Sequence, residues 1–145
     1  MRAYRRYHLN TLGPAFVVLA VLLATCGGNP TPRGDPERGK ALFTSEAKPP
    51  CATCHTIEGV SNGQIGPNLT HIGTEAAARV SDPTYTGSAQ DAEGYIRESI
   101  LTPNAFIASN CPTGTCFKDI MPQDFGKSLS EQQIADLVAF LLSQQ

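Results

Sequence analysis

The 145-residue sequence contains few methionine and histidine side chains, both of which can bind a transition metal. It has two methionines, and since one of them is Met1, only Met121 lies inside the chain. Its three histidines are His8, His55 and His71. Apart from its cysteines and carboxylates, the chain therefore offers very few side chains that can bind a transition metal.

Positive charge is also scarce beyond the first segment. Of the 11 Lys and Arg residues, 3 lie in residues 1–10, which leaves 8 against 13 Asp and Glu, all of them after residue 26. Residues 27–145 thus carry a formal charge of 8 minus 13, or −5. Proteins that bind nucleic acid normally present a basic patch, so this balance argues against a nucleic-acid partner.

A long hydrophobic run is missing as well. The apolar stretch TLGPAFVVLAVLLAT (11–25) has 15 residues, fewer than the roughly 20 of a membrane-spanning helix. It follows three arginines, which is typical of an export signal. Its end, LATC, resembles the lipobox of bacterial lipoproteins, which implies a signal over residues 1–26 and a lipid on Cys26. An uncleaved anchor helix over residues 7–25, or simple secretion, are the alternatives, and all three place the rest of the chain outside the cytoplasm.

The remainder of the sequence predicts one small helical domain. A Gly- and Pro-rich linker occupies residues 27–34, and the domain is expected over residues 35–145. No segment has the pattern of a strand with a hairpin partner. An all-α domain of three to five helices is predicted, with helical segments that begin at residue 35, lie near 75–80, and span about 91–101 and 129–144.

Capping residues support the first and last of these helices. Asp35 can cap the free amides and Pro36 suits the first helical position, while Ser130 and Gln133 form a capping box. Helices this short bury little apolar surface in about 110 residues. The domain is therefore expected to need a bound apolar group to complete its core.

The stretch PPCATCHTIEG (49–59) suggests what that group is. C-x-x-C-H is the attachment motif of c-type haem. Cys51 and Cys54 would form thioethers with the two porphyrin vinyl groups, and His55 would bind the iron. A disulfide-exchange pair or half of a zinc site are the alternatives, but neither a βαβ unit nor further ligands at zinc spacing are predicted. The predicted cofactor is one covalently attached haem c.

The second axial position of the iron has three possible occupants. They are Met121 in KDIMPQDFG, His71 in NLTHIGT, or no protein ligand. A methionine with a histidine raises the reduction potential relative to two histidines. The residues by themselves leave these alternatives open.

Several motifs together resemble a class I monohaem cytochrome c. They are GKALF (39–43), CATCH (51–55), GPNL (66–69), MP (121–122) and LSEQQIADLVAFL (129–141), in the order and spacing of that family. The resemblance covers residues 35–145 and implies a small cytochrome c fold, with its helices wrapped round one haem. It further implies that the first and last helices cross where Gly39 and Phe43 meet Phe140.

The same resemblance assigns the ligands. It implies that Met121 is the distal ligand and that the Pro67 carbonyl accepts the Nδ1 hydrogen of His55, which fixes the tautomer of the imidazole. It leaves His71 with a structural or surface role.

Cys111 and Cys116, in NCPTGTCFKDIMP, remain after the lipid and the haem have taken the other cysteines. Outside the cytoplasm two such thiols usually pair, and Pro112 with Gly114 permits the tight turn that pairing needs. A disulfide is predicted, with two free thiols as the alternative. Because Cys116 lies five residues before Met121, we hypothesise that the bridge stiffens the loop that presents the methionine.

An iron with two axial ligands has no open site for a substrate, which favours one-electron transfer over enzymatic activity. A haem sensor or a peroxidase-like enzyme is the competing class. YIRESILTPNAFI (95–107) and the segment 121–141 are similar to cytochrome c domains attached to respiratory oxidases and to the monohaem lipoprotein subunit of alternative complex III, a quinol-oxidising assembly. This implies a relay subunit of a respiratory or photosynthetic complex on the periplasmic face of a bacterial cell membrane, with multihaem cytochrome partners. An independent membrane-anchored shuttle to a terminal oxidase is the alternative.

Overall fold

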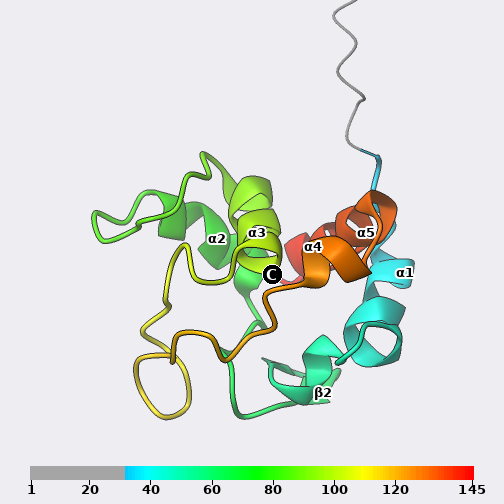
Figure 1. The fold of residues 1–145 in the computed structure, drawn as a ribbon, viewed down its shortest axis with the longest axis horizontal. Coiled ribbons are helices and arrows are strands. Elements are labelled where there is room, and N and C mark those ends of the chain that lie inside the picture. The colour runs from blue at the N-terminus through cyan, green and yellow to red at the C-terminus, as the bar shows by residue number, and fades with distance from the viewer. Residues whose placement is uncertain (1–31) are drawn as a thin grey trace, which may run out of the picture.

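The computed structural model describes residues 32–145 (Figure 1). The predicted signal, the lipid-anchor residue Cys26 and most of the linker lie outside the described residues. Within residues 32–145 short helices dominate, and two very short strands accompany them. The elements are α1 (Pro36–Ala41), a π-helical turn (Leu42–Glu46), a 3₁₀ turn (Cys51–Thr53), β1 (Thr56–Ile57), β2 (Ser61–Asn62), α2 (Ile72–Val80), α3 (Ala92–Leu101), α4 (Phe125–Ser128) and α5 (Glu131–Leu142).

The predicted helical class is confirmed, with two additions. Strands β1 and β2 form an antiparallel hairpin in which Thr56 pairs with Asn62 and Ile57 with Ser61, so the prediction that no hairpin exists was wrong. Two residues per strand are too few to show an alternating pattern. Helix α4 was also not predicted, because four residues make a single turn, and α2 begins earlier than the expected segment 75–80.

Helices α1 and α5 cross in direct contact, as expected (Figure 1). A Cβ atom on Gly39 would lie 2.0 Å from the carbonyl oxygen of Asp136, so only glycine lets the two backbones approach this closely. Next to this contact, the ring centroids of Phe43 and Phe140 lie 5.4 Å apart. The predicted meeting of Gly39 and Phe43 with Phe140 is therefore confirmed.

A buried acid that sequence reasoning missed lies at the same crossing. The Asp136 side chain is 2% exposed. Its Oδ2 accepts a hydrogen bond from Arg38 Nε at 2.9 Å, and its Oδ1 accepts one from the Asp35 backbone N–H at 2.8 Å. The hydrogen bond from Arg38 holds the pKa of Asp136 below its usual value, although burial opposes this shift. The carboxylate thus fastens the start of α1 to α5.

Asp136→Asn should destabilise the protein in a pH-dependent way. A lowered carboxyl pKa contributes stability above the ordinary value of about 4, and this contribution is lost as pH falls through the folded-state pKa. We expect the variant to lose about 2 kcal/mol of unfolding free energy near pH 7, the strength of hydrogen bonds to a charged group. The difference between wild type and variant should shrink below pH 4 in urea unfolding followed by circular dichroism.

The control for this variant is Asp124→Asn. Asp124 is exposed and its side chain makes no capping hydrogen bond to α4, so stability should hardly change at either pH. An Asp136→Asn deficit of equal size at pH 3 and pH 7 would contradict the assigned role of the carboxylate.

The hydrophobic core joins the α1–α5 crossing to α3. Leu42, Phe43, Ile57, Ile134 and Leu137 have the most deeply buried large apolar side chains. Tyr95, Ile96 and Ile100 extend this cluster from α3. In Figure 1, α2 and α3 lie on one side of the molecule and α1 and α5 on the other. No helix in residues 32–145 has the length and apolar character needed to cross a membrane.

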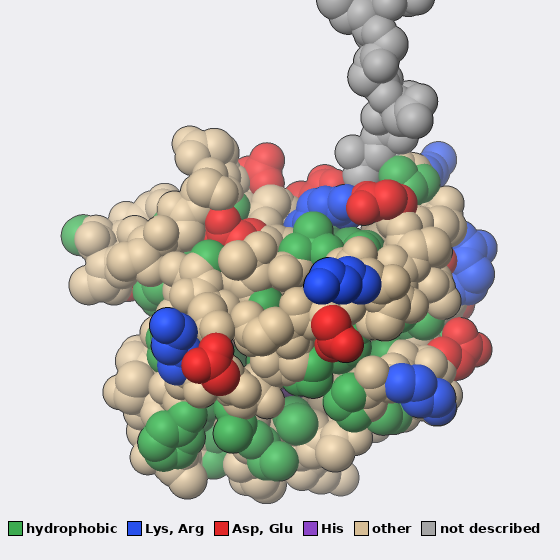
Figure 2. Space-filling model, viewed as in Figure 1, with side chains coloured by type: hydrophobic (Ala, Val, Ile, Leu, Met, Phe, Trp, Pro, Cys, Tyr) green, Lys and Arg blue, Asp and Glu red, His purple; other side chains and the backbone are tan. Residues whose placement is uncertain are grey.

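Three large hydrophobic side chains are nevertheless exposed in the described part of the chain. They are Ile65, Phe117 and Ile120, at 51%, 70% and 54% exposure. Figure 2 shows hydrophobic side chains gathered along the lower edge of the molecule, where Figure 1 places β2 and the loop between α3 and α4. All three of these exposed side chains lie outside the helices.

Candidate haem site

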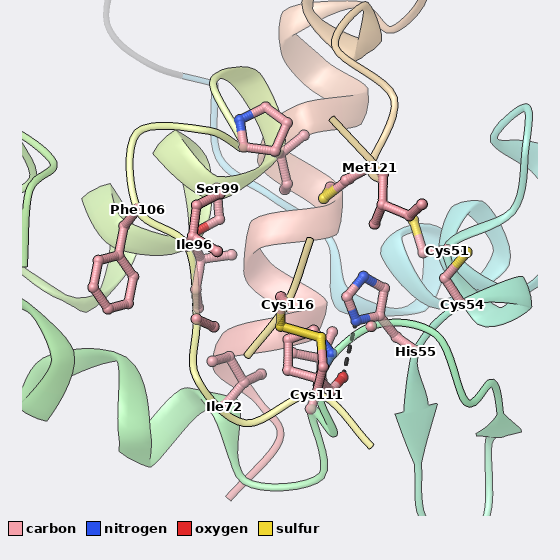
Figure 3. Close-up of a pocket in the computed structure, with 18 of the residues that line it drawn as sticks. Cys51, Cys54, His55, Ile72, Ile96, Ser99, Phe106, Cys111, Cys116 and Met121 are labelled. Carbon is pink, nitrogen blue, oxygen red and sulfur yellow. Dashed lines mark hydrogen bonds between the residues drawn. A yellow bond between two sulfur atoms is a disulfide. The ribbon is translucent and has the colours of Figure 1, made fainter. Parts of the chain in front are cut away.

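The C-x-x-C-H segment forms a tight turn. The backbone N–H groups of Cys54 and His55 both donate to the Cys51 carbonyl, at 3.1 and 3.0 Å. Neither Cys51 nor Cys54 is in a disulfide, and both are partly buried. The turn keeps both sulfur atoms and the His55 ring around one cavity (Figure 3), which is the arrangement that thioether attachment beside an iron ligand requires.

The His55 imidazole is held in one tautomer. Its Nδ1 lies 2.9 Å from the Pro67 carbonyl oxygen and donates to it, as the family resemblance implied. Nε2 is then the nitrogen with a free lone pair. Burial lowers the pKa of His55, and the Pro67 hydrogen bond only partly offsets this. A neutral imidazole with a free Nε2 is the form that binds iron.

Gly66 makes room for this ring. A Cβ atom at position 66 would lie 2.5 Å from His55 Cε1 and 2.8 Å from Nδ1. The GPNL motif contains Gly66 but predicts no role for it. Its role follows from the close approach of the backbone to the imidazole, which no local pattern predicts.

The hairpin β1–β2, which was not predicted, supports the same segment through hydrogen bonds. The buried Ser61 hydroxyl donates to the His55 carbonyl at 2.8 Å and accepts from the Ile57 N–H at 2.9 Å. The Gly66 N–H donates to the Cys54 carbonyl at 2.9 Å. The hairpin therefore fixes the backbone on which the predicted attachment residues lie. Ser61 was missed because nothing in a short polar turn distinguishes it.

Met121 reaches the cavity from the loop before α4. It is partly buried, packs against the core, and lines the same cavity as Cys51 and His55. Figure 3 shows its side chain and the His55 ring among the residues that line the cavity. His71, the rival donor, is exposed and does not line this cavity. The structure thus brings together one histidine and one methionine.

Cys111 and Cys116 form a disulfide, with their sulfur atoms 2.06 Å apart. The turn between them contains Gly114 at φ +106°, a conformation that favours glycine. Both cysteines line the haem-site cavity, and the Cys116 N–H donates to the Ala108 carbonyl at 2.9 Å. The bridge therefore forms part of the wall beside His55 (Figure 3).

Replacing both bridge cysteines, Cys111→Ser with Cys116→Ser, should loosen the Met121 loop. Cross-links of this kind restrict alternative chain conformations. We expect the near-infrared Fe–S charge-transfer band of the ferric protein to disappear at a lower temperature than in wild type. A band that melts at the same temperature in both proteins would refute the stiffening hypothesis.

The Cys51 thiol does not have the character of a disulfide-exchange group. Burial raises the pKa of Cys51 to about 11. Redox-active cysteines have lowered pKa values, because the thiolate is the nucleophile. Within residues 32–145, no three His, Cys, Asp or Glu side chains cluster as a metal-ion site. These properties favour haem attachment over the two alternative interpretations of the motif.

The cavity itself fits a c-type haem. Its lining combines the two free thiols, the neutral imidazole and the thioether with an apolar wall. Four helices and the loop after α3 form this wall, through Ile72, Ile96, Ile100, Phe106, Phe125 and Leu141. A porphyrin is a large, mostly apolar ring, so it would complete the thin core that the short helices leave. When bound, such a haem supplies one-electron redox chemistry at its iron.

The chain resembles known proteins in sequence and in structure. The chain is similar to a chain in the crystal structure of SoxXA from P. pantotrophus, with 22% identity, a TM-score of 0.48, and coverage of 78% of this chain and 83% of that one. Residues 36–145 match the family model described as cytochrome c. The chain therefore belongs to the cytochrome c family, whose members carry covalently bound haem c and transfer electrons.

Proposed function

We propose that this protein is a membrane-tethered monohaem cytochrome c that relays electrons within a respiratory or photosynthetic complex. The observation that carries the proposal is the cavity that His55 and Met121 share. With both side chains as axial ligands, the iron has no open coordination position. Binding of a substrate would have to displace a ligand, whereas gain and loss of one electron require no movement. The chain is thus proposed to act as an electron carrier and not as an enzyme on its own.

The proposed roles of the individual residues follow from the chemistry of the donors. Cys51 and Cys54 hold the haem covalently, and His55 Nε2 binds the iron while Pro67 keeps its tautomer. Met121 contributes a thioether, a weak donor to ferric iron that favours the ferrous state and raises the reduction potential. One haem is proposed, because the sequence contains a single C-x-x-C-H motif.

Electron entry is proposed at the exposed rim of the cavity. Phe117 and Ile120 line the cavity and yet are mostly exposed to solvent. A redox partner that covers this rim would approach the haem closely and bury apolar surface, while small transient interfaces suffice for electron exchange. The net charge of −5 on residues 27–145 favours a partner whose facing surface is positive.

The proposed location rests on the sequence before residue 32. A short apolar signal that ends at Cys26 supports a lipid anchor on the periplasmic face of the cell membrane. The similarity of residues 95–107 and 121–141 to the monohaem subunit of alternative complex III supports a relay role beside a multihaem cytochrome. An independent membrane-anchored shuttle to a terminal oxidase is the second candidate, since it would use the same iron chemistry. A haem sensor or peroxidase is less well supported, because it requires an open iron position.

A native gel of membranes solubilised in mild detergent, stained for haem and probed for this chain, tests the proposal. A relay subunit should migrate within a large complex that contains multihaem cytochromes. Migration as a small haem protein, under conditions that keep other complexes intact, would replace the relay with a free shuttle. The Cys51→Ser, Cys54→Ser variant should lose covalent haem stain, and Cys26→Ala should leave the membrane fraction without losing haem.

A further inference from the structure

The residues just before Met121 have little hydrophobic burial to hold them in place. Between α3 and α4 the loop contains no helix or named strand. Phe117 and Ile120, on the approach to Met121, are 70% and 54% exposed. A methionine that must stay on one side of a cavity therefore needs another restraint, since apolar packing of its neighbours does not supply one.

The Asn104 side chain supplies that restraint through three hydrogen bonds. Its Nδ2 donates to Asp119 Oδ1 at 2.6 Å and to Gln123 Oε1 at 3.0 Å. Its Oδ1 accepts from the Asp119 backbone N–H at 3.1 Å. Asp119 lies two residues before Met121 and Gln123 two residues after it. One amide group therefore holds the chain on both sides of the methionine.

Two further details connect this group to Met121 itself. Gln123 Nε2 donates to the Met121 carbonyl at 2.7 Å. Asn104 is therefore linked to the methionine backbone through a single residue, Gln123. Asp119 has φ +62° and is the one non-glycine residue with positive φ in the described part of the chain. Residues other than glycine adopt this conformation rarely, and Asn and Asp are the commonest exceptions. The bonds from Asn104 stabilise the turn that directs Met121 toward the cavity.

Asn104 is itself fixed to the helical part of the domain. It follows the end of α3, where the Thr102 N–H donates to the Glu98 carbonyl at 2.7 Å. The next residue, Ala105, accepts a hydrogen bond from the Thr86 hydroxyl at 2.5 Å. Asn104 also lies on the lining of the haem-site cavity. Asn104 is thus fixed in place and contacts the chain on both sides of Met121. It is therefore placed to set the position of the methionine.

We propose that Asn104 is a positioning residue that keeps Met121 on the iron. The inference rests on the proposed function, in which Met121 is the axial ligand. Asn104 would not touch the iron, but would lower the tendency of Met121 to leave it. The segment YIRESILTPNAFI contains Asn104, but its local pattern predicts no role for this residue.

The test uses the ferric, haem-loaded protein and imidazole as a competing ligand. The Fe–S charge-transfer band reports Met121 on the iron, so the imidazole concentration that halves the band measures how firmly the methionine is held. For Asn104→Ala this concentration should fall about 3- to 10-fold, as expected for the loss of one or two hydrogen bonds. For Asn104→Asp the imidazole concentration should fall at least as far. This variant keeps an acceptor for the Asp119 N–H but places a second carboxylate against the carboxylate of Asp119.

Thr86→Val is the matched control. It removes the hydrogen bond to Ala105, next to Asn104, but breaks no link to residues 119–123, so its imidazole midpoint should stay within twofold of wild type. Thermal unfolding of each protein distinguishes a loosened ligand from an unfolded domain. Equal midpoints for Asn104→Ala, Asn104→Asp and wild type, or an equal fall for Thr86→Val, would overturn the inference. A wild-type protein that is folded but lacks the band would overturn Met121 ligation itself, and with it the inference.

Discussion

Met121→Ala should change the reduced protein from one that binds no carbon monoxide into one that binds it stoichiometrically. The cavity brings His55 and Met121 together from opposite loops, and no other imidazole or thioether of residues 32–145 lines it. In the proposed ligation, loss of the methionine sulfur would leave the iron with only its histidine ligand. The Fe–S band of the ferric protein should vanish in the same variant.

The matched control for this prediction is His71→Ala. His71 is exposed at the start of α2 and lies away from the cavity lining. This variant should keep the Fe–S band and should bind no carbon monoxide. Rapid carbon monoxide binding by the wild-type protein would instead favour the sensor or peroxidase class. A wild-type protein that lacks the band, together with carbon monoxide binding by reduced His71→Ala, would reassign the axial ligand to His71.

Gly39→Ala should lower the stability of this domain far more than Gly126→Ala, although both substitutions add a single methyl group. The new Cβ would lie 2.0 Å from the Asp136 carbonyl oxygen, 2.6 Å from its carbon and 2.7 Å from Phe140 Cβ. Because two of these atoms belong to backbone, no side-chain rotation can relieve the clash, and α1 and α5 must move apart. We expect a cost of about 3 kcal/mol, which for a domain of this size lowers the unfolding temperature by about 15 °C.

Gly126→Ala provides the comparison, measured by thermal unfolding of the haem-loaded proteins. Its nearest contact would be Leu101 Cδ2 at 3.2 Å, the end of a flexible side chain. Gly126 also lies in α4, where alanine is favoured over glycine. Its unfolding temperature should stay within a few degrees of wild type. A similar small change for Gly39→Ala would show that the helix crossing is more tolerant than the structure implies.

The parts of this protein that could be predicted were those with a chemical signature or a local pattern. C-x-x-C-H is specific because thioether attachment and iron ligation need those three side chains in that order. The capping box at Ser130 and Gln133 is present in α5, since capping depends on residues within one turn. The predicted pairing of Cys111 with Cys116 likewise rested on how few cysteines remain.

The parts that could not be predicted depend on contacts between distant segments. The hairpin β1–β2 has too few residues to display a strand pattern, yet it holds His55 through Ser61. Asp136 looks like a surface residue of an amphipathic helix, but the approach of α1 buries it against Arg38. In the same way, Asn104 and Gly66 gain their importance only when the loops fold back toward Met121 and His55.

By itself, the sequence determined the covalent chemistry, the small set of possible ligands and the helical character of the domain. These depend on which side chains exist and on how they are spaced along a few turns of chain. The tertiary structure alone decided that Met121 and not His71 shares the cavity with His55, and that Asn104 holds both flanks of the methionine. The physical reason is that ligand selection depends on distances across the fold, and those distances are set by packing between segments far apart in sequence.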